Sequence, residues 1–224
     1  MAEQKSFKTR VKDEVIANAK MFKDNFVDCE YLVCSDAFVK KPYYIIGAHT
    51  SNYAHLTGVS LTISPDDFFW KSLDGTLQES DFSFIKKDQT EAEAKGSVRR
   101  KINALPHLAS IFENDTLVEE DFVKNRVRCA FAAGKTACTL GFAKSVPSKP
   151  QSLMKGNQLN PSTAKAVELV LRRKRGDEAF DEIIRGEMEA LIKYSDSIDS
   201  LLSNRLRQQI QSEKAVQLRN DHDE

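Results

Sequence analysis

The sequence predicts an α+β protein with helices in its N-terminal part, short antiparallel strands further along and a helical C-terminal extension. Apolar residues at helical spacing indicate an amphipathic helix over residues 8–27. From about residue 116, short apolar segments alternate with Gly, Pro and Ser, a pattern typical of a β meander. Residues 187–219 carry one apolar stripe at helical spacing. This order of elements is typical of the α+β class.

Local patterns predict the elements of the first half. Two runs rich in β-branched and aromatic residues, 30–35 and 42–48, predict a hairpin. Ser64 followed by Pro65 and two acidic residues is a signal for the start of a helix. Residues 86–101 are charged and poor in apolar side chains, which predicts a loop or a short exposed helix.

In the second half, the predicted meander consists of four segments, 116–122, 127–134, 137–144 and 150–156. The segment 166–175 is ambiguous, because Val167, Leu169 and Leu171 alternate as in a strand while the residue types also suit a helix. The apolar stripe over 187–219 has to be buried. It can pack on the domain or pair with a second copy, so a homodimer through this segment is one alternative.

Composition limits the class of protein. The chain has 224 residues, of which 41% are hydrophobic and 29% charged, as expected for one large domain or a domain with an appendage. It contains no run of eighteen apolar residues and no apolar segment near its start, so we expect no membrane span and no signal peptide. The four cysteines form no CxxC pair. Reduced cysteines and a cytoplasmic location are expected.

The net charge of zero conceals an uneven distribution. Residues 127–176 hold ten Lys and Arg and a single acidic residue, whereas residues 177–224 hold six basic and twelve acidic residues. A basic block of this density predicts a surface for a polyanion such as nucleic acid. The alternative is a solvated face whose charge the acidic tail balances or masks. The candidate phosphate ligands are Lys144, Lys155, Lys165, Arg172, Arg173 and Lys174.

A second candidate site is the polar segment over residues 51–58, which surrounds one histidine with hydrogen-bonding side chains. Read as a strand, the segment places Asn52 on one side and both His55 and Thr57 on the other. His55 and Thr57 then face one cleft. The alternative is a core histidine that is bonded to a backbone carbonyl.

Two other classes of site are not favoured. Gly134-Lys135-Thr136 resembles the end of a phosphate-binding P-loop, but Cys129 stands where that motif needs glycine, and a strand follows. This tripeptide is therefore expected to be a turn between strands. The four histidines and four cysteines show no metal-ligand spacing, so neither a metal nor a cofactor is expected.

Several motifs, taken in order, resemble a known group of proteins. They are NYAHLTGV (52–59), ISPDDFFWK (63–71), LPHLASI (105–111) and ACTLGFAK (137–144). The set resembles one of the phage- and mobile-element-associated nuclease families grouped as barnase–EndoU–colicin–RelE-like, and HLTG is its most specific part. The resemblance covers roughly residues 10–186. It implies a nuclease domain over 1–186 and a separate helical extension over 187–224.

The resemblance also implies a fold and an activity. The implied fold has helices first and then a small curved antiparallel sheet, with a hairpin at 166–186. The implied activity is that of a metal-independent endoribonuclease of toxin or effector type, with RNA such as tRNA as substrate and an antitoxin or immunity partner. His55 of HLTG is carried over as the catalytic residue, with Thr57 beside it. The segment Asn160–Thr163 departs in order from a Pro-Asn-Thr-like element of the family.

The expected mechanism uses the 2′-OH of RNA as the nucleophile. In this scheme His55 transfers the proton, Thr57 and Asn52 orient the substrate, and the basic residues stabilise the phosphate. The products are a 2′,3′-cyclic phosphate and a 5′-OH.

Two alternatives come from other classes of protein. An ADP-ribosyltransferase-like toxin would use His55 with a late acidic residue, namely Glu168, Glu178 or Glu182. A non-catalytic module would bind nucleic acid through the basic strands and pair through its C-terminal helices.

Overall fold

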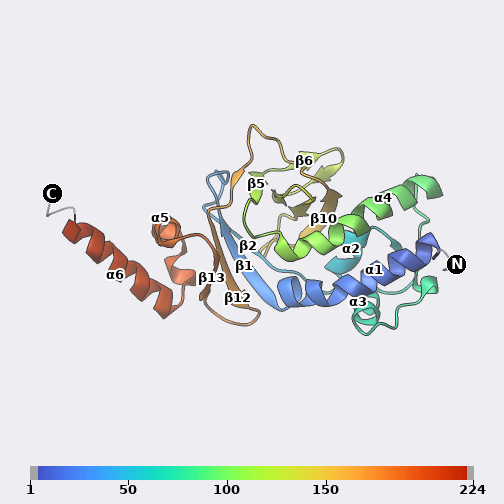
Figure 1. The fold of residues 1–224 in the computed structure, drawn as a ribbon, viewed down its shortest axis with the longest axis horizontal. Coiled ribbons are helices and arrows are strands. Elements are labelled where there is room, and N and C mark those ends of the chain that lie inside the picture. Colours follow the sequence, from blue (N-terminus) through green and yellow to red (C-terminus); the bar gives the residue numbers. More distant parts are fainter. Residues whose placement is uncertain (1–4, 221–224) are drawn as a thin grey trace.

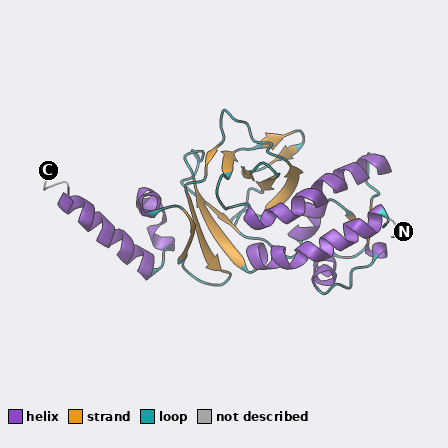
Figure 2. Ribbon diagram, viewed as in Figure 1, coloured by secondary structure: helices purple, strands orange, loops and turns teal. Residues whose placement is uncertain are grey.

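The computed structural model describes residues 5–220, which form helices and two main antiparallel sheets (Figures 1 and 2). The α-helices are α1 (Phe7–Phe22), α2 (Asn52–Thr57), α3 (Pro65–Leu73), α4 (Glu91–Ala104), α5 (Met188–Ile198) and α6 (Asn204–Asn220). The π-helical and 3₁₀ turns are η1 (Lys23–Val27), η2 (Glu79–Asp81), η3 (Leu105–Ser110) and η4 (Asp199–Leu201). The predicted α+β class is confirmed.

The strands of the described residues fall into two larger sheets and two small strand pairs. One sheet has the order β13-β12-β1-β2 and the other β10-β9-β8-β5-β11, so the chain contains two main sheets rather than one. The strands of the first are β1 (Cys29–Cys34), β2 (Tyr44–Ile46), β12 (Leu169–Lys174) and β13 (Glu182–Arg185). Those of the second are β5 (Leu117–Glu120), β8 (Phe131–Gly134), β9 (Cys138–Phe142), β10 (Pro150–Lys155) and β11 (Lys165–Ala166). One small pair is β3 (Ser60–Leu61) with β4 (Phe82–Ser83), which α3 and η2 separate in sequence, and the other is the hairpin of β6 (Val123–Lys124) with β7 (Val127–Arg128).

Most sequence-predicted elements are present. The hairpin β1–β2 and the hairpin β12–β13 are antiparallel as expected, and β5, β8, β9 and β10 follow one another as a meander. The prediction for 86–101 was wrong in length, because α4 runs over fourteen residues. Its start has a reciprocal capping box between Thr90 and Glu93, and its buried residues Ala94, Val98 and Ile102 recur every four positions.

Strand β1 is buried on both faces, which explains its uninterrupted apolar sequence. Tyr31 and Val33 belong to the main core beneath α1 and the meander sheet. Leu32 and Cys34 point to the opposite face and pack in a second core with residues of α5 and α6. The two cores therefore share this strand.

The C-terminal helices pack on the domain. Leu191, Ile198, Leu206 and Ile210 are buried in the second core together with Leu169 and Leu171 of β12. The apolar stripe predicted for 187–219 is thus covered within the chain, as two helices rather than one (Figure 1). Three of the acidic tail residues, Asp221, Asp223 and Glu224, lie outside the described residues.

Candidate active site

The segment predicted as the catalytic strand is a helix. Residues Asn52–Thr57 form α2, which ends at Gly58 with φ of +75°. The side chain of Asn52 accepts the backbone N–H of His49 at 2.8 Å and so closes the turn at the start of the helix. Gly58 supplies the left-handed conformation that ends it. The alternation expected for a strand was therefore wrong.

The helix separates the three predicted catalytic residues. Thr57 is fully buried, and its hydroxyl donates to the carbonyl of Ala54 at 2.8 Å, so it does not share a cleft with His55. Asn52 is half-buried and holds the helix start. The imidazole of His55 is exposed. Of the three, His55 alone presents a side chain that is free to reach a substrate.

Two residues of the HLTG motif, His55 and Gly58, contact Lys101, a lysine near the end of α4. The Nζ of Lys101 donates to the backbone carbonyl of His55 at 2.8 Å. A Cβ on Gly58 would come within 2.6 Å of Cδ of Lys101, so the lysine stem occupies the space left by the missing side chain. The motif thus fixes an ammonium group beside the residue that carries the exposed imidazole.

The surroundings of Lys101 make its ammonium unusually acidic. Burial, together with the nearby charge of Lys86, lowers the pKa of Lys101 to about 8. Burial also lowers the pKa of Lys86. A lysine with a pKa close to the operating pH can exchange a proton with a reacting group.

Lys101 lines a basic groove between α4, the β6–β7 hairpin and β10. The groove has a volume of about 330 Å³, and its lining includes the cations Arg100, Lys101, Lys124 and Lys155 but no acidic side chain. Within residues 5–220, none of these four cations is engaged in an ion pair. The groove therefore offers uncompensated positive charge, which suits a phosphate backbone. His55 itself does not line it and touches it only through its carbonyl.

The predicted phosphate ligands do not lie together on one surface. Lys155 lies in the basic groove and Lys144 in another cavity, whereas Lys165 and Lys174 are exposed outside both. The assignment of Arg172 and Arg173 to a free basic surface was wrong. Arg172 makes two hydrogen bonds to Glu182, at 2.7 and 2.6 Å. Arg173 pairs with Glu30 at 2.6 Å, with only 17% and 13% of the two side chains exposed.

Three residues of the groove were missed by sequence reasoning: Arg100, Lys101 and Lys124. They precede the basic block that the charge count singled out. The run Arg99-Arg100-Lys101 was the visible signal, but only the helical periodicity of α4 shows which of its members face inward.

The remaining predictions concern features outside the groove. Gly134-Lys135-Thr136 is the turn between β8 and β9, as expected. Within residues 5–220, the side chains of His, Cys, Asp and Glu form no group of three or more that could hold a metal ion. In the same part of the chain, every helix is too short or too polar to cross a bilayer.

A substitution at Gly58 tests the contact between the HLTG motif and Lys101. Gly58→Ala is expected to lower the free energy of unfolding by about 1–2 kcal/mol, because the left-handed conformation disfavours a Cβ. It should also lower activity, because the new methyl group displaces Lys101. Gly75→Ala is the matched control, since Gly75 has φ of +74° but open space around its Cβ position. Denaturant unfolding and an activity assay measure the two effects, and an unchanged rate per folded Gly58→Ala molecule would contradict this placement of Lys101.

Together, the fold and the groove define an α+β protein with an open cationic groove that suits a polyanionic substrate. Residues 14–161, about two thirds of the chain, match the family described as phage-Barnase-EndoU-ColicinE5/D-RelE like nuclease4. The chain belongs to this nuclease family. The matched range contains both α2 and the basic groove. Neither the curated proteins nor the solved structures include a significant match to the chain.

Proposed function

We propose that the protein is a metal-independent endoribonuclease whose active site is the basic groove. The observation that carries this proposal is Lys101, a lysine with a lowered pKa that is held beside His55 in a groove of unpaired cations. Membership of a nuclease family supports phosphodiester cleavage as the reaction. The groove supplies positive charge and the ammonium group of Lys101, and His55 beside it supplies an imidazole.

In the proposed mechanism, the exposed imidazole of His55, which lies beside the groove and not in its lining, removes the proton from the 2′-OH of a nucleotide at the edge of the groove. The 2′-oxygen attacks phosphorus and forms the new O–P bond, and the bond between phosphorus and the 5′-oxygen breaks. The ammonium of Lys101 gives its proton to the departing 5′-oxygen. Arg100, Lys124 and Lys155 stabilise the charge that builds up on the phosphoryl oxygens. The products are a 2′,3′-cyclic phosphate and a 5′-OH.

The role of Lys101 as the acid follows from its proton affinity. A general acid works best when its pKa lies near the pH of the reaction, and the pKa of Lys101 is lowered to about 8. It is therefore mostly protonated at neutral pH, yet it releases its proton more readily than an ordinary lysine. His55 is left to act as the base.

The nature of the products tests the proposal. Purified protein is incubated with total tRNA and with a mixed RNA pool in the presence of EDTA, and the new ends are identified. Discrete cuts that end in a cyclic phosphate and a 5′-OH are expected. Loss of cleavage in EDTA, or ends that carry a 5′-phosphate, would contradict the mechanism. Intact RNA under conditions of measurable binding would instead favour a non-catalytic module.

We further propose a toxin or effector role with RNA such as tRNA as target, and a protein or RNA that neutralises it. The phage and colicin terms in the family description support this role. Expression of the wild type in a bacterial host is expected to arrest growth, while Lys101→Met is tolerated. Equal growth of both strains at equal protein levels would count against it.

A further inference from the structure

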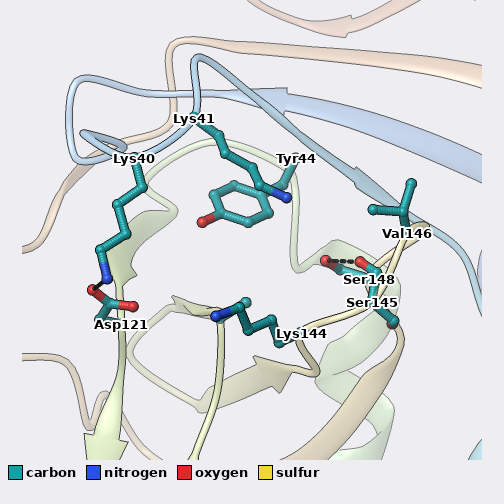
Figure 3. Close-up of a pocket in the computed structure, with 9 residues that line it drawn as sticks. Lys40, Lys41, Tyr44, Asp121, Lys144, Ser145, Val146 and Ser148 are labelled. Atoms are coloured by element: carbon teal, nitrogen blue, oxygen red, sulfur yellow. Dashed lines mark hydrogen bonds and ion pairs between the residues drawn. The ribbon is translucent and has the colours of Figure 1, made fainter.

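A second basic cavity, the lysine pocket, lies between the loop that precedes β2 and the loop that joins β9 to β10 (Figure 3). It has a volume of about 150 Å³. Its polar lining comes from Lys40, Lys41, Tyr44, Lys144, Ser145 and Ser148, with Asp121 at one edge. The pocket thus brings together three lysines from two segments that are about a hundred residues apart in sequence.

Two of the three ammonium groups are uncompensated. Lys40 forms an ion pair with Asp121. Lys41 lies over the ring of Tyr44, with its Nζ 5.5 Å from the ring centroid. Within residues 5–220, neither Lys41 nor Lys144 pairs with a carboxylate, and both side chains are exposed. The pocket therefore carries two positive charges that are available to an anion.

The hydroxyl groups of the pocket are engaged within the protein. Ser145 donates to the carbonyl of Pro147 at 2.8 Å, and Ser148 donates to the carbonyl of Ser145 at 3.1 Å. The free donors are therefore the ammonium groups. Lysine binds phosphate as a point charge without reading a base, so this lining suits a backbone phosphate.

Both walls of the pocket are held in place. The carboxylate of Glu120 accepts the backbone N–H of Val39 at 2.9 Å and of Lys40 at 3.0 Å. It also accepts the hydroxyl of Tyr44 at 2.7 Å. On the opposite wall, the N–H of Ser148 donates to the carbonyl of Ile45 at 2.7 Å. The loops that carry the lysines are therefore held before any ligand arrives, which reduces the entropic cost of binding.

Strand β10 connects the lysine pocket to the basic groove. Ser148 lines the pocket, and Met154 and Lys155 line the groove. Met154 lies six positions after Ser148, mostly along β10, which corresponds to at most about 20 Å at roughly 3.3 Å per residue. A stacked nucleic-acid strand covers that distance in about six nucleotides at 3.4 Å per step.

We propose that the lysine pocket binds a backbone phosphate of the RNA several nucleotides away from the bond that is cut. This inference rests on the proposed function, since it assumes that RNA occupies the basic groove. It gives the enzyme a preference for longer strands, because a short RNA in the groove cannot reach the pocket.

The test uses the double variant Lys41→Ala/Lys144→Ala and two lengths of RNA. Binding is measured with a fluorescent 2′-O-methyl RNA of about 12 nucleotides, a length typical of single-strand sites. This RNA cannot react, so its binding does not depend on cleavage. Cleavage is measured separately with a trinucleotide. The control, Lys8→Ala/Lys12→Ala, removes two lysines of α1 that line neither cavity.

We expect the double variant to bind the long RNA about tenfold more weakly, with a salt slope lower by about 2, as for two lost phosphate contacts. Cleavage of the trinucleotide should stay at the wild-type rate, and the control should bind like the wild type. Long-RNA binding equal to that of the control would overturn the inference. So would a comparable loss in trinucleotide cleavage, because the lysines would then act at the cut bond.

The design separates this inference from the proposed function. If the wild type binds the 12-nucleotide RNA through these lysines but cleaves no RNA, the pocket is supported and the nuclease mechanism fails. If the wild type cleaves the trinucleotide but the double variant binds the long RNA as tightly as the control does, the mechanism stands and the proposed role of the lysine pocket is wrong.

Discussion

Lys101→Met is expected to reduce RNA cleavage by about 10²- to 10⁴-fold, the range that a general acid contributes. Methionine keeps most of the length of the side chain and still fits beside Gly58, but it carries no proton to transfer. The variant should remain folded, because it also removes a charge whose burial is costly enough to lower the pKa of Lys101 to about 8. Circular dichroism and single-turnover cleavage measure the two effects.

Lys101→Arg separates proton transfer from charge. Arginine keeps the positive charge in the groove but holds its proton too tightly to act as an acid at neutral pH. We therefore expect this variant to bind RNA as the wild type does and to cleave it almost as slowly as Lys101→Met. Lys95→Met, on the same helix but outside the groove, is the matched control. Wild-type cleavage by Lys101→Arg would limit the lysine to an electrostatic role.

The pH dependence of kcat/KM reports the same group, because this ratio follows the ionisation of the free enzyme. An acid must be protonated to act. Since the pKa of Lys101 is about 8, kcat/KM should fall about tenfold per pH unit above that value. A value that rises through this range would instead indicate that the free amine of Lys101 acts as a base.

A single 2′-deoxy nucleotide on the 5′ side of the cut bond is expected to abolish cleavage. The 2′-oxygen is the nucleophile in the proposed mechanism, and nothing in the groove replaces it. Binding should change little, because the groove is lined by cations that contact the phosphates. The measurement is single-turnover cleavage of a synthetic RNA that carries one mapped cut site.

The control places the 2′-deoxy nucleotide one position further from the cut, where the rate should match that of the all-ribose strand. Cleavage at the deoxy position would show that water attacks the phosphorus. The protein would then be a nuclease that does not need a ribose 2′-OH in its substrate.

Much of the fold follows from local sequence, but helix α2 shows where such prediction fails. Asn52 to Thr57 alternates in polarity over too few residues to distinguish a strand from a helix. The helical conformation is instead set by the hydrogen bond that the Asn52 side chain accepts at the helix start and by the left-handed Gly58 at its end. For β1, the run of β-branched and aromatic residues was enough to predict the strand. The pattern of β12 stayed ambiguous by itself, and only the family resemblance implied a strand there.

The candidate site depended on contacts that no spacing reveals. His55 was identified from its motif, but Lys101 lies 46 residues further along and meets it only in the folded chain. Likewise, Arg173 is basic in sequence, yet it is neutralised by Glu30 from a strand 143 residues away. Counting charges along the chain therefore overestimated the free basic surface of β12 and overlooked the groove on α4.

The central claim is that Lys101 protonates the departing 5′-oxygen, and a changed leaving group tests it most directly. In an RNA whose 5′-oxygen at the cut is replaced by sulfur, the leaving group is a thiolate, whose conjugate acid has a pKa of about 8.5 and needs no proton from the enzyme. Lys101→Met should cleave this substrate at nearly the wild-type rate, although it barely cleaves ordinary RNA. If the variant remains equally impaired on the sulfur substrate while the wild type cleaves both, Lys101 is not the acid.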